Sequence, residues 1–243
     1  MKSYTVLTAI LLWSFAALSQ ASECAILLHG LARTADSMSQ LEQRLEQQGY
    51  KLVNVDYPST TMPIAELADI AVGAGIAQCQ ADHTSAINFV THSLGGILVR
   101  QYYSVHKPQS LHRVVMLGPP NNGSQVVDRF KHMPAYKWLN GPAGMQLGTD
   151  SNSVPSNLGP VNFDLGVIAG TQSINPILSS FLPNPDDGKV SVASTKVEGM
   201  CGFVALPVTH PLMMRNKTVI DEVVSFLTSG QFTSPQASNY CHQ

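Results

Sequence analysis

The stretch that decides the fold is Thr91-His92-Ser93-Leu94-Gly95-Gly96. It follows a short apolar run at 86–90, which predicts a buried strand, and it precedes residues 97–103, which are rich in helix formers and contain no breaker. A serine at such a strand-to-helix turn is typical of the nucleophile elbow, written G-x-S-x-G. The tight turn lifts the serine hydroxyl above the sheet, and the next N–H then faces the place where an oxyanion forms.

The match to that pattern has one departure. Small residues two places before and two places after the serine let the strand and the helix approach closely. Gly95 meets this need, whereas Thr91 stands where the pattern has its first glycine. A threonine fits if its side chain turns away. The other interpretation of the stretch is an ordinary strand, loop and helix in which Ser93 caps the helix.

The N-terminus is predicted to be a secretory signal peptide, residues 1–21. Lys2 gives a positive start, residues 6–18 form a short apolar run, and Ser19-Gln20-Ala21 supplies a small-residue cleavage site. We therefore expect export to the periplasm or secretion from the cell. An N-terminal membrane anchor is the alternative, but the run is short for a bilayer span. No later segment is long and apolar enough to cross a membrane, so no stable membrane span is predicted.

Composition and charge narrow the class of protein. Of the 243 residues, 44% are hydrophobic and 12% are charged, and neither a repeat nor a linker interrupts the chain. A single domain is therefore predicted over residues 22–243. Cleavage removes one of the 14 basic residues, Lys2, and none of the 16 acidic ones, so the net charge changes from −2 to −3. No basic cluster remains that would bind nucleic acid or an anionic membrane surface. We expect a monomer without cofactor or metal.

Strands alternate with helices along the chain. Strands are predicted at 24–28, 51–55, 86–90, 111–117, 165–169 and 203–206, and helices at 37–48, 63–79, 97–103 and 216–227. This alternation predicts a mainly parallel sheet of about six strands with helices on both faces. In such sheets ligands bind beyond the carboxyl ends of the strands. The residues that carry chemistry follow strands and so meet at that edge: His29-Gly30, Ser93, Gly118, Asp187 and His210.

Four segments have weaker patterns. Periodicity fades between residues 123 and 160, where only a short helix at 126–131 is expected, and a long irregular segment of this kind is usually functional or mobile. We expect it to border the acyl pocket and to move over it. A short helix is predicted at 177–182, a helix or irregular turn at 189–195, and a tail at 230–243.

The whole mature chain resembles the small bacterial lipase/esterase branch of the α/β-hydrolases, which lacks a separate cap domain. The resemblance rests on the strand ending at His29-Gly30, the elbow at 91–96, and Gly118-Pro119-Pro120-Asn121-Asn122-Gly123-Ser124, which is similar to the G-T-P-H-x-G-S of many lipases with two changes. Asp186-Asp187-Gly188-Lys189-Val190 and the strand before His210 complete it. It implies an α/β-hydrolase fold in its minimal form.

The resemblance also implies roles for individual residues. Ser93 would be the nucleophile, His210 the general base and then acid, and Asp187 the carboxylate that orients it, in the Ser-Asp-His order of this family. Asp186 is the alternative acid. Asp187 is preferred because the family sets the acid directly before Gly-x-Val. The N–H groups of Leu31 and Leu94 would form the oxyanion hole.

The activity that follows is hydrolysis of a carboxylic ester, a small molecule or a lipid, through an acyl-enzyme on Ser93. The same residues serve an acyltransferase, a thioesterase or an amidase, so these stay open. A non-catalytic exported binding protein on this fold is the alternative of another class. His29 and His92 are expected to shape the site without reacting, and the remaining histidines to lie at the surface: His83, His106, His112, His132 and His242.

Four cysteines occur in the exported part of the chain, Cys24, Cys79, Cys201 and Cys241. An even count in an oxidising compartment favours two disulfides, and no C-x-x-C motif suggests a zinc or redox site. All four fall at the edge of the sheet opposite the active site, where strands begin and helices end. Joining neighbours there predicts the pairs Cys24–Cys79 and Cys201–Cys241, with free thiols as the alternative.

Overall fold

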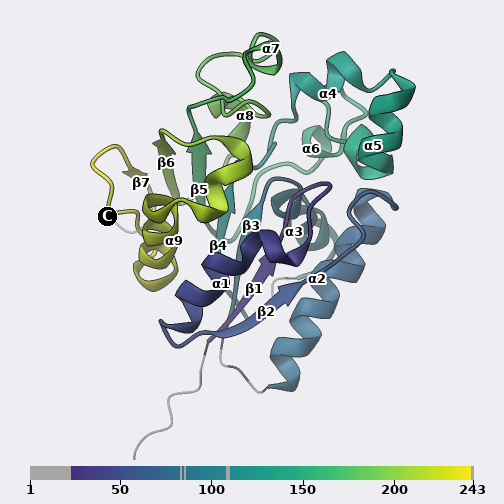
Figure 1. Cartoon of the computed structure of the whole chain (residues 1–243). Helices are drawn as coiled ribbons and strands as arrows, with labels where there is room; N and C mark the ends of the chain where they lie inside the picture. The colour runs from purple at the N-terminus through teal and green to yellow at the C-terminus, as the bar shows by residue number, and fades with distance from the viewer. Residues whose placement is uncertain (1–22, 83, 85, 108–109, 242–243) are drawn as a thin grey trace, which may run out of the picture.

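The computed structural model describes residues 23–82, 84, 86–107 and 110–241 (Figure 1). The predicted signal peptide, residues 1–21, lies outside these residues, as do His83 and His242. Among the described residues, no helix has both the length and the apolar character that a bilayer crossing requires.

One sheet forms the centre of the fold, with strands in the order β2-β1-β3-β4-β5-β6-β7. The first six strands are parallel, and β7 runs antiparallel to β6. Their bounds are Cys24–Leu28 (β1), Lys51–Val55 (β2), Ile87–His92 (β3), Leu111–Leu117 (β4), Asp164–Gly170 (β5), Gly202–Leu206 (β6) and Ser238–Asn239 (β7). The predicted mainly parallel sheet is confirmed, with one strand more than expected.

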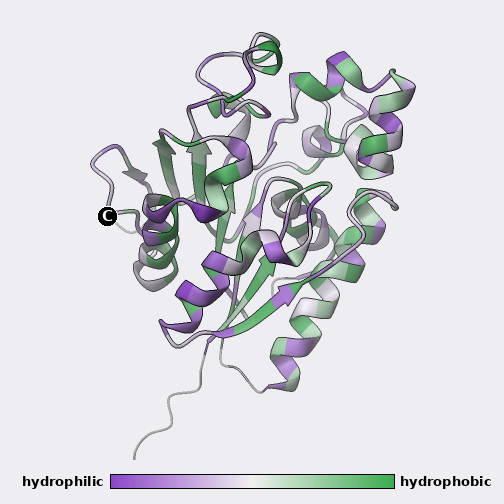
Figure 2. Ribbon diagram, in the orientation of Figure 1, coloured by the Kyte–Doolittle hydropathy of each residue, from purple (hydrophilic) through white to green (hydrophobic). Residues whose placement is uncertain are grey.

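Helices cover both faces of the sheet (Figure 1). The helices that cover these two faces are η1 (Ala35–Met38), α1 (Ser39–Glu46), α2 (Ile64–Ala81), α3 (Leu94–Val105), η2 (His210–Arg215) and α9 (Lys217–Ser229). Side chains of β1 alternate between two buried clusters, with Ile26 and Leu28 facing α2 and α3, and Ala25 and Leu27 facing α1 and α9. In Figure 2 the strands are therefore mostly hydrophobic, and the helices that enclose them, such as α1, present hydrophilic residues outward.

The segment between residues 123 and 160 is more regular than expected. It contains three helices, α4 (Gln125–Phe130), α5 (Pro134–Met145) and α6 (Val154–Asn157), which lie beyond the carboxyl ends of the strands (Figure 1). The Ser124 hydroxyl caps α4 by accepting from the Val126 N–H at 3.2 Å. A non-helical residue, Gly141, with φ of 63°, interrupts α5. The short helix expected at 126–131 is confirmed as α4, whereas the prediction that the rest of the segment is irregular was wrong, because α5 and α6 are too short or too interrupted to show a clear hydrophobic period.

Two further short helices stand at the same edge. The helix predicted at 177–182 is α7 (Pro176–Ser179), and the one allowed at 189–195 is α8 (Val192–Thr195). Each begins at a side-chain cap: Asn175 accepts from two N–H groups of α7 at 3.1 Å, and Ser191 accepts from the Ser194 N–H at 3.1 Å. These polar caps, rather than apolar periodicity, fix where both helices start.

The tail at 230–243 contains the strand that the sequence does not indicate. Residues 238–239 form β7, and the N–H of Tyr240 donates to the carbonyl of Cys201 at 2.7 Å. The disulfide between Cys201 and Cys241 holds this segment against β6. A strand of two polar residues has no hydrophobic alternation that the sequence could show. It forms because the disulfide holds it beside the edge of β6.

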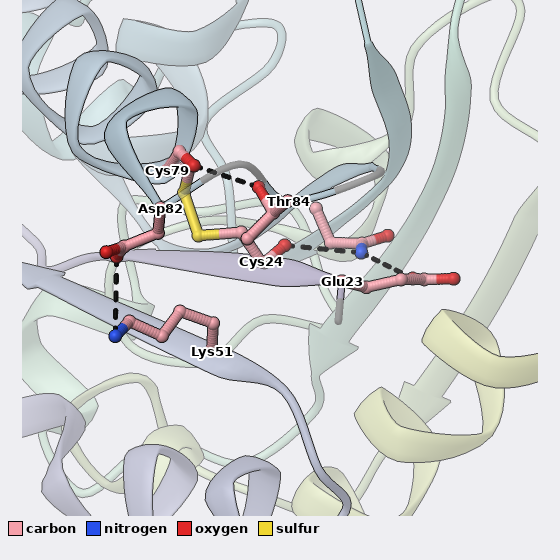
Figure 3. The surroundings of a disulfide bond; sticks show 7 residues. Glu23, Cys24, Lys51, Cys79, Asp82 and Thr84 are labelled. Carbon is pink, nitrogen blue, oxygen red and sulfur yellow. Dashed lines mark hydrogen bonds and ion pairs between the residues drawn. A yellow bond between two sulfur atoms is a disulfide. The ribbon is translucent and has the colours of Figure 1, made fainter. Parts of the chain in front are cut away.

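Both predicted disulfides are confirmed, Cys24–Cys79 and Cys201–Cys241. Figure 3 shows the first, which joins the start of β1 to the end of α2. Beside it the Thr84 hydroxyl donates to the Cys79 carbonyl at 3.0 Å, and the Lys51 ammonium lies 3.4 Å from the Asp82 carboxylate. Both bridges sit at the amino ends of the strands, opposite Ser93.

Reduction of the disulfides is expected to lower thermal stability and to leave activity intact. The loops that they close span sequence separations of 55 and 40 residues, and each is worth about 4 kcal/mol in the chain-entropy model. Cys241 is exposed, so this bridge should be reduced first, whereas the bridge of the buried Cys24 resists longer. Melting curves and kcat, followed together during titration with dithiothreitol, test the expectation. A loss of kcat at temperatures where the protein stays folded would contradict it.

Candidate active site

Ser93 lies at a sharp turn between β3 and α3. Its φ is 52° and its ψ −115°, a conformation that non-glycine residues rarely adopt, and its N–H donates to the Leu117 carbonyl at 2.9 Å. A Cβ on Gly95 would come within 2.7 Å of the Leu28 carbonyl oxygen, so only glycine fits there. Thr91 is buried, and its hydroxyl has no hydrogen-bond partner among the described residues. The threonine is therefore accommodated without contributing a polar contact.

His210 and Asp187 form a buried pair. Nδ1 of the imidazole lies 2.6 Å from Oδ2 of the carboxylate, and the His210 N–H donates to the Asp187 carbonyl at 3.0 Å. A carboxylate only accepts, so Nδ1 carries a proton, and in the neutral ring Nε2 then keeps its lone pair. The other carboxylate oxygen accepts from the N–H groups of Lys189 and Val190 at 3.0 and 2.8 Å. This geometry fixes both the tautomer and the orientation of His210.

Gly118 provides the room for this pair. Its φ is 55°, and a Cβ there would stand 3.0 Å from both Oδ2 of Asp187 and Nδ1 of His210. The glycine after β4 is therefore required by the pair as well as by its own backbone conformation.

Asp186, the alternative acid, makes hydrogen bonds to other residues. Its Oδ2 accepts from the Ser179 hydroxyl at 2.5 Å, and its Oδ1 accepts from the Gly188 N–H at 2.7 Å. It thus ties α7 to the turn that carries Asp187, while Asp187 alone of the two contacts His210.

His92 packs against His210. Its ring centroid lies 4.7 Å from that of His210, and its Nε2 lies 3.0 Å from the His210 carbonyl oxygen. The carbonyl can only accept, so Nε2 carries the proton. Burial, followed by the neighbouring His210, holds the pKa of His92 well below its ordinary value. His92 is therefore a neutral ring that positions the backbone of His210.

His29 is buried behind the first loop. Its ring stacks on Tyr57 at 4.0 Å between centroids, its Nε2 accepts from the Tyr57 N–H at 3.3 Å, and the Tyr57 hydroxyl donates to the His29 carbonyl. Burial lowers the pKa of His29. After it, Gly30 leaves space for the elbow, because a Cβ there would lie 2.6 Å from Nδ1 of His92.

The two N–H groups predicted for the oxyanion hole are at the expected edge. Leu94 is the first residue of α3, so its N–H has no acceptor within the helix. Leu31 follows the first strand and lines the same cavity as Ser93. No backbone carbonyl of the described loops accepts from either N–H.

A cavity of about 320 Å³ brings the predicted residues together. Ser93, Asp187 and His210 line it, along with a set of side chains from the segment 123–160: Ser124, Val126, Val127, Tyr136, Asn140 and Leu147. That segment therefore borders the cavity, as its position after β4 suggests. Sequence reasoning gave no role to the lining residues Arg33, Lys189 and Ile174, although Lys189 stands within the stretch 186–190 that carries the resemblance.

Within the part of the chain that the structure describes, the remaining histidines and the cysteines offer no second site. His106 and His132 are exposed, and His112 is partly exposed, with its Nδ1 3.3 Å from Oε2 of Glu23. Among the described residues, one group of possible metal ligands has its atoms close together, Asp164 with Cys201 and Cys241. Those two sulfurs form a disulfide and so are not thiolate ligands.

No protein-family model matches the sequence, and neither does a curated protein. Solved structures do. Lipase BlEst2 of Bacillus licheniformis in its mature form has a TM-score of 0.68 at 16% identity, covering 85% of this chain and 92% of the lipase. Phospholipase PlaB of Legionella pneumophila has a TM-score of 0.63 at 19% identity, covering 88% and 60%. Lipase B of Aspergillus fumigatus has a TM-score of 0.67 at 14% identity, covering 90% and 56%.

The chain thus spans less than two thirds of the length of two of these proteins. At such identities the likeness concerns the arrangement of the chain and not its activity. The order and direction of the strands, the elbow at Ser93 and these similarities lead to one conclusion: the chain has the α/β-hydrolase fold.

Proposed function

We propose that the protein is a serine hydrolase that cleaves carboxylic esters, with lipid-like esters as its class of substrate. The observation that carries the proposal is the pair of His210 and Asp187, 2.6 Å apart, on the cavity that Ser93 also lines. A serine hydroxyl is a poor nucleophile at neutral pH and needs an imidazole to take its proton. In the neutral ring of His210, Nε2 is available for that step.

The proposed reaction has two halves. The Ser93 hydroxyl oxygen attacks the ester carbonyl while its proton passes to Nε2 of His210, and the Asp187 carboxylate stabilises the imidazolium that results. The bond to the alcohol breaks, the alcohol leaves with that proton, and the acyl group stays on Ser93. Water then attacks the acyl-enzyme with His210 again taking a proton, which it returns to Ser93 as the acid is released.

The N–H groups of Leu31 and Leu94 are proposed to stabilise the oxyanion in both halves. Each such donor is typically worth about 3 kcal/mol of barrier. Their support is their place at the loop after β1 and at the start of α3, with no competing backbone acceptor among the described loops.

The similar structures support the choice of ester. They are named as lipases, a phospholipase and a carboxyl esterase, the last from a metagenomic source. The lining of Val126, Val127 and Leu147 suits a hydrocarbon chain.

A panel of 4-nitrophenyl esters from acetate to palmitate, run beside an emulsified triglyceride, tests the function. The cavity is at the small end of ligand sites, so we expect kcat/KM to peak between butanoate and octanoate and to fall towards palmitate. Matched thioester and anilide substrates and an added alcohol acceptor distinguish thioesterase, amidase and acyltransferase activity. Saturable binding of esters without turnover would favour a binding protein instead.

We also propose that the chain is exported after loss of residues 1–21. Its support is the charged start and short apolar run of that segment, together with two disulfides, which persist in oxidising compartments. The N-terminal sequence of protein recovered outside the cytoplasm tests the proposal.

A further inference from the structure

The cavity beside Ser93 carries two cations that the proposed mechanism does not use. Arg33 and Lys189 both line it, and both are exposed to solvent. Arg33 lies two residues after Leu31, in the loop that follows β1. Lys189 lies two residues after Asp187, in the loop that joins β5 to β6. The strand order places β3, which leads into Ser93, between β1 and β5, so the loops that carry the two cations follow strands on opposite sides of β3.

Neither cation forms an ion pair with a carboxylate in the described part of the chain. The ion pairs found there use other basic side chains, namely Arg44, Lys51, Arg113, Lys131 and Lys217. Asp187 is the one acidic residue among those lining the cavity, and its Oδ2 is held by His210. The mouth of the cavity is therefore positive, although the chain as a whole has a net charge of −2.

The two charges also act on each other and on the site. Partial burial lowers the pKa of Lys189, while Asp187 raises it and Arg33 lowers it. Arg33 contributes in the same way to the lowered pKa of His92, after burial and His210. Like charges held near one another repel, and an anion that enters between them is attracted by both.

We propose that the natural substrate is an ester that carries an anionic group, which Arg33 and Lys189 bind at the mouth of the cavity. The inference rests on the proposed ester hydrolysis at Ser93. A carboxylate, sulfate or phosphate suits the pair, because a guanidinium binds such oxyanions through two parallel hydrogen bonds and an ammonium adds a point charge. The apolar lining then holds the hydrocarbon part of the same molecule.

Two pairs of esters test this with the folded enzyme. The first compares 4-nitrophenyl hydrogen suberate with its methyl ester, so that the charge is on the acyl side. The second compares 4-sulfophenyl hexanoate with phenyl hexanoate, so that the charge is on the alcohol side. We expect kcat/KM to favour the anion by about tenfold in one pair, which identifies the side, and the preference to weaken as salt screens the charges.

The variants locate the preference. In Arg33→Gln/Lys189→Gln it should fall to about one, while the charge-conserving Lys189→Arg should retain it. Lys137→Gln is the matched control, because it removes an exposed cation of α5 that does not line the cavity, and it should keep the full preference. Circular dichroism and melting curves show that each variant is folded.

A direct binding measurement separates this inference from the proposed function. Calorimetry with hexyl sulfate and hexan-1-ol should show tighter binding of the anion to the wild type and equal binding to the double variant. That result would support the anion site even if no ester were hydrolysed. Turnover of neutral esters with no anionic preference, or a preference that survives the double substitution, would overturn the inference and leave the proposed hydrolase intact.

Discussion

Replacing Ser93 with alanine is expected to lower kcat by about 10⁶-fold, the loss found when the nucleophile of a serine triad is removed. The substitution takes away the one oxygen that can form the acyl-enzyme, whereas His210 and Asp187 keep their 2.6 Å contact. The elbow fixes the strained backbone conformation of residue 93, and alanine is no larger than serine. We therefore expect the substitution to leave the packing around this residue unchanged. Steady-state hydrolysis of 4-nitrophenyl butanoate measures the loss.

A fluorophosphonate probe supplies the second readout, since it forms a covalent bond to an activated serine. We expect the wild type to be labelled at Ser93 and Ser93→Ala to stay unlabelled. Ser104→Ala is the matched control, because Ser104 is an exposed serine on the same helix, and it should behave like the wild type. Labelling of Ser93→Ala at another serine would transfer the role of nucleophile to that residue.

The sheet could be predicted from the sequence because its strands are buried on both faces. A strand such as β1, in which every residue is buried, is a continuous apolar run with a turn residue at its end. The bounds of β1, β2 and β4 agree with the prediction. The short helix expected at 126–131 is α4, whereas α5 was not predicted because a glycine interrupts it and leaves no long amphipathic period. The strand β7 depends on a disulfide, a contact between distant residues.

The candidate site likewise contains some residues that the sequence indicates and others that it does not. Ser93 and His210 could be proposed from the sequence because Ser93 directly follows a strand, His210 stands in the short segment after the last long strand, and both residue types suit a serine triad. The choice between Asp186 and Asp187 needed the structure, since both stand in the same turn and only one contacts His210. The sequence does not indicate a shared binding role for Arg33 and Lys189, because the cavity that both line is assembled from loops more than 150 residues apart.

Asp187→Asn is expected to lower kcat by about 10⁴-fold through the tautomer of His210. The N–H groups of Lys189 and Val190 donate to Oδ1 of Asp187, so an asparagine there must place its amide oxygen at that position. Its NH₂ group then faces Nδ1 of His210 and forces this nitrogen to accept. The ring proton moves to Nε2, which can no longer take the proton of Ser93. The pH dependence of kcat and the ring proton resonances of His210 report the change.

Asp186→Asn is the matched comparison, because the two aspartates are neighbours in one turn and both are buried. Its amide oxygen can still accept from the Gly188 N–H, and its NH₂ can donate to the Ser179 hydroxyl, so both present contacts have a replacement. We therefore expect kcat to stay within about tenfold of the wild type, with α7 still attached to the turn. Since neither substitution changes side-chain size, a difference between them reflects the contact with His210. The reverse ranking would assign the acid to Asp186 and leave the 2.6 Å contact of Asp187 without a role in catalysis.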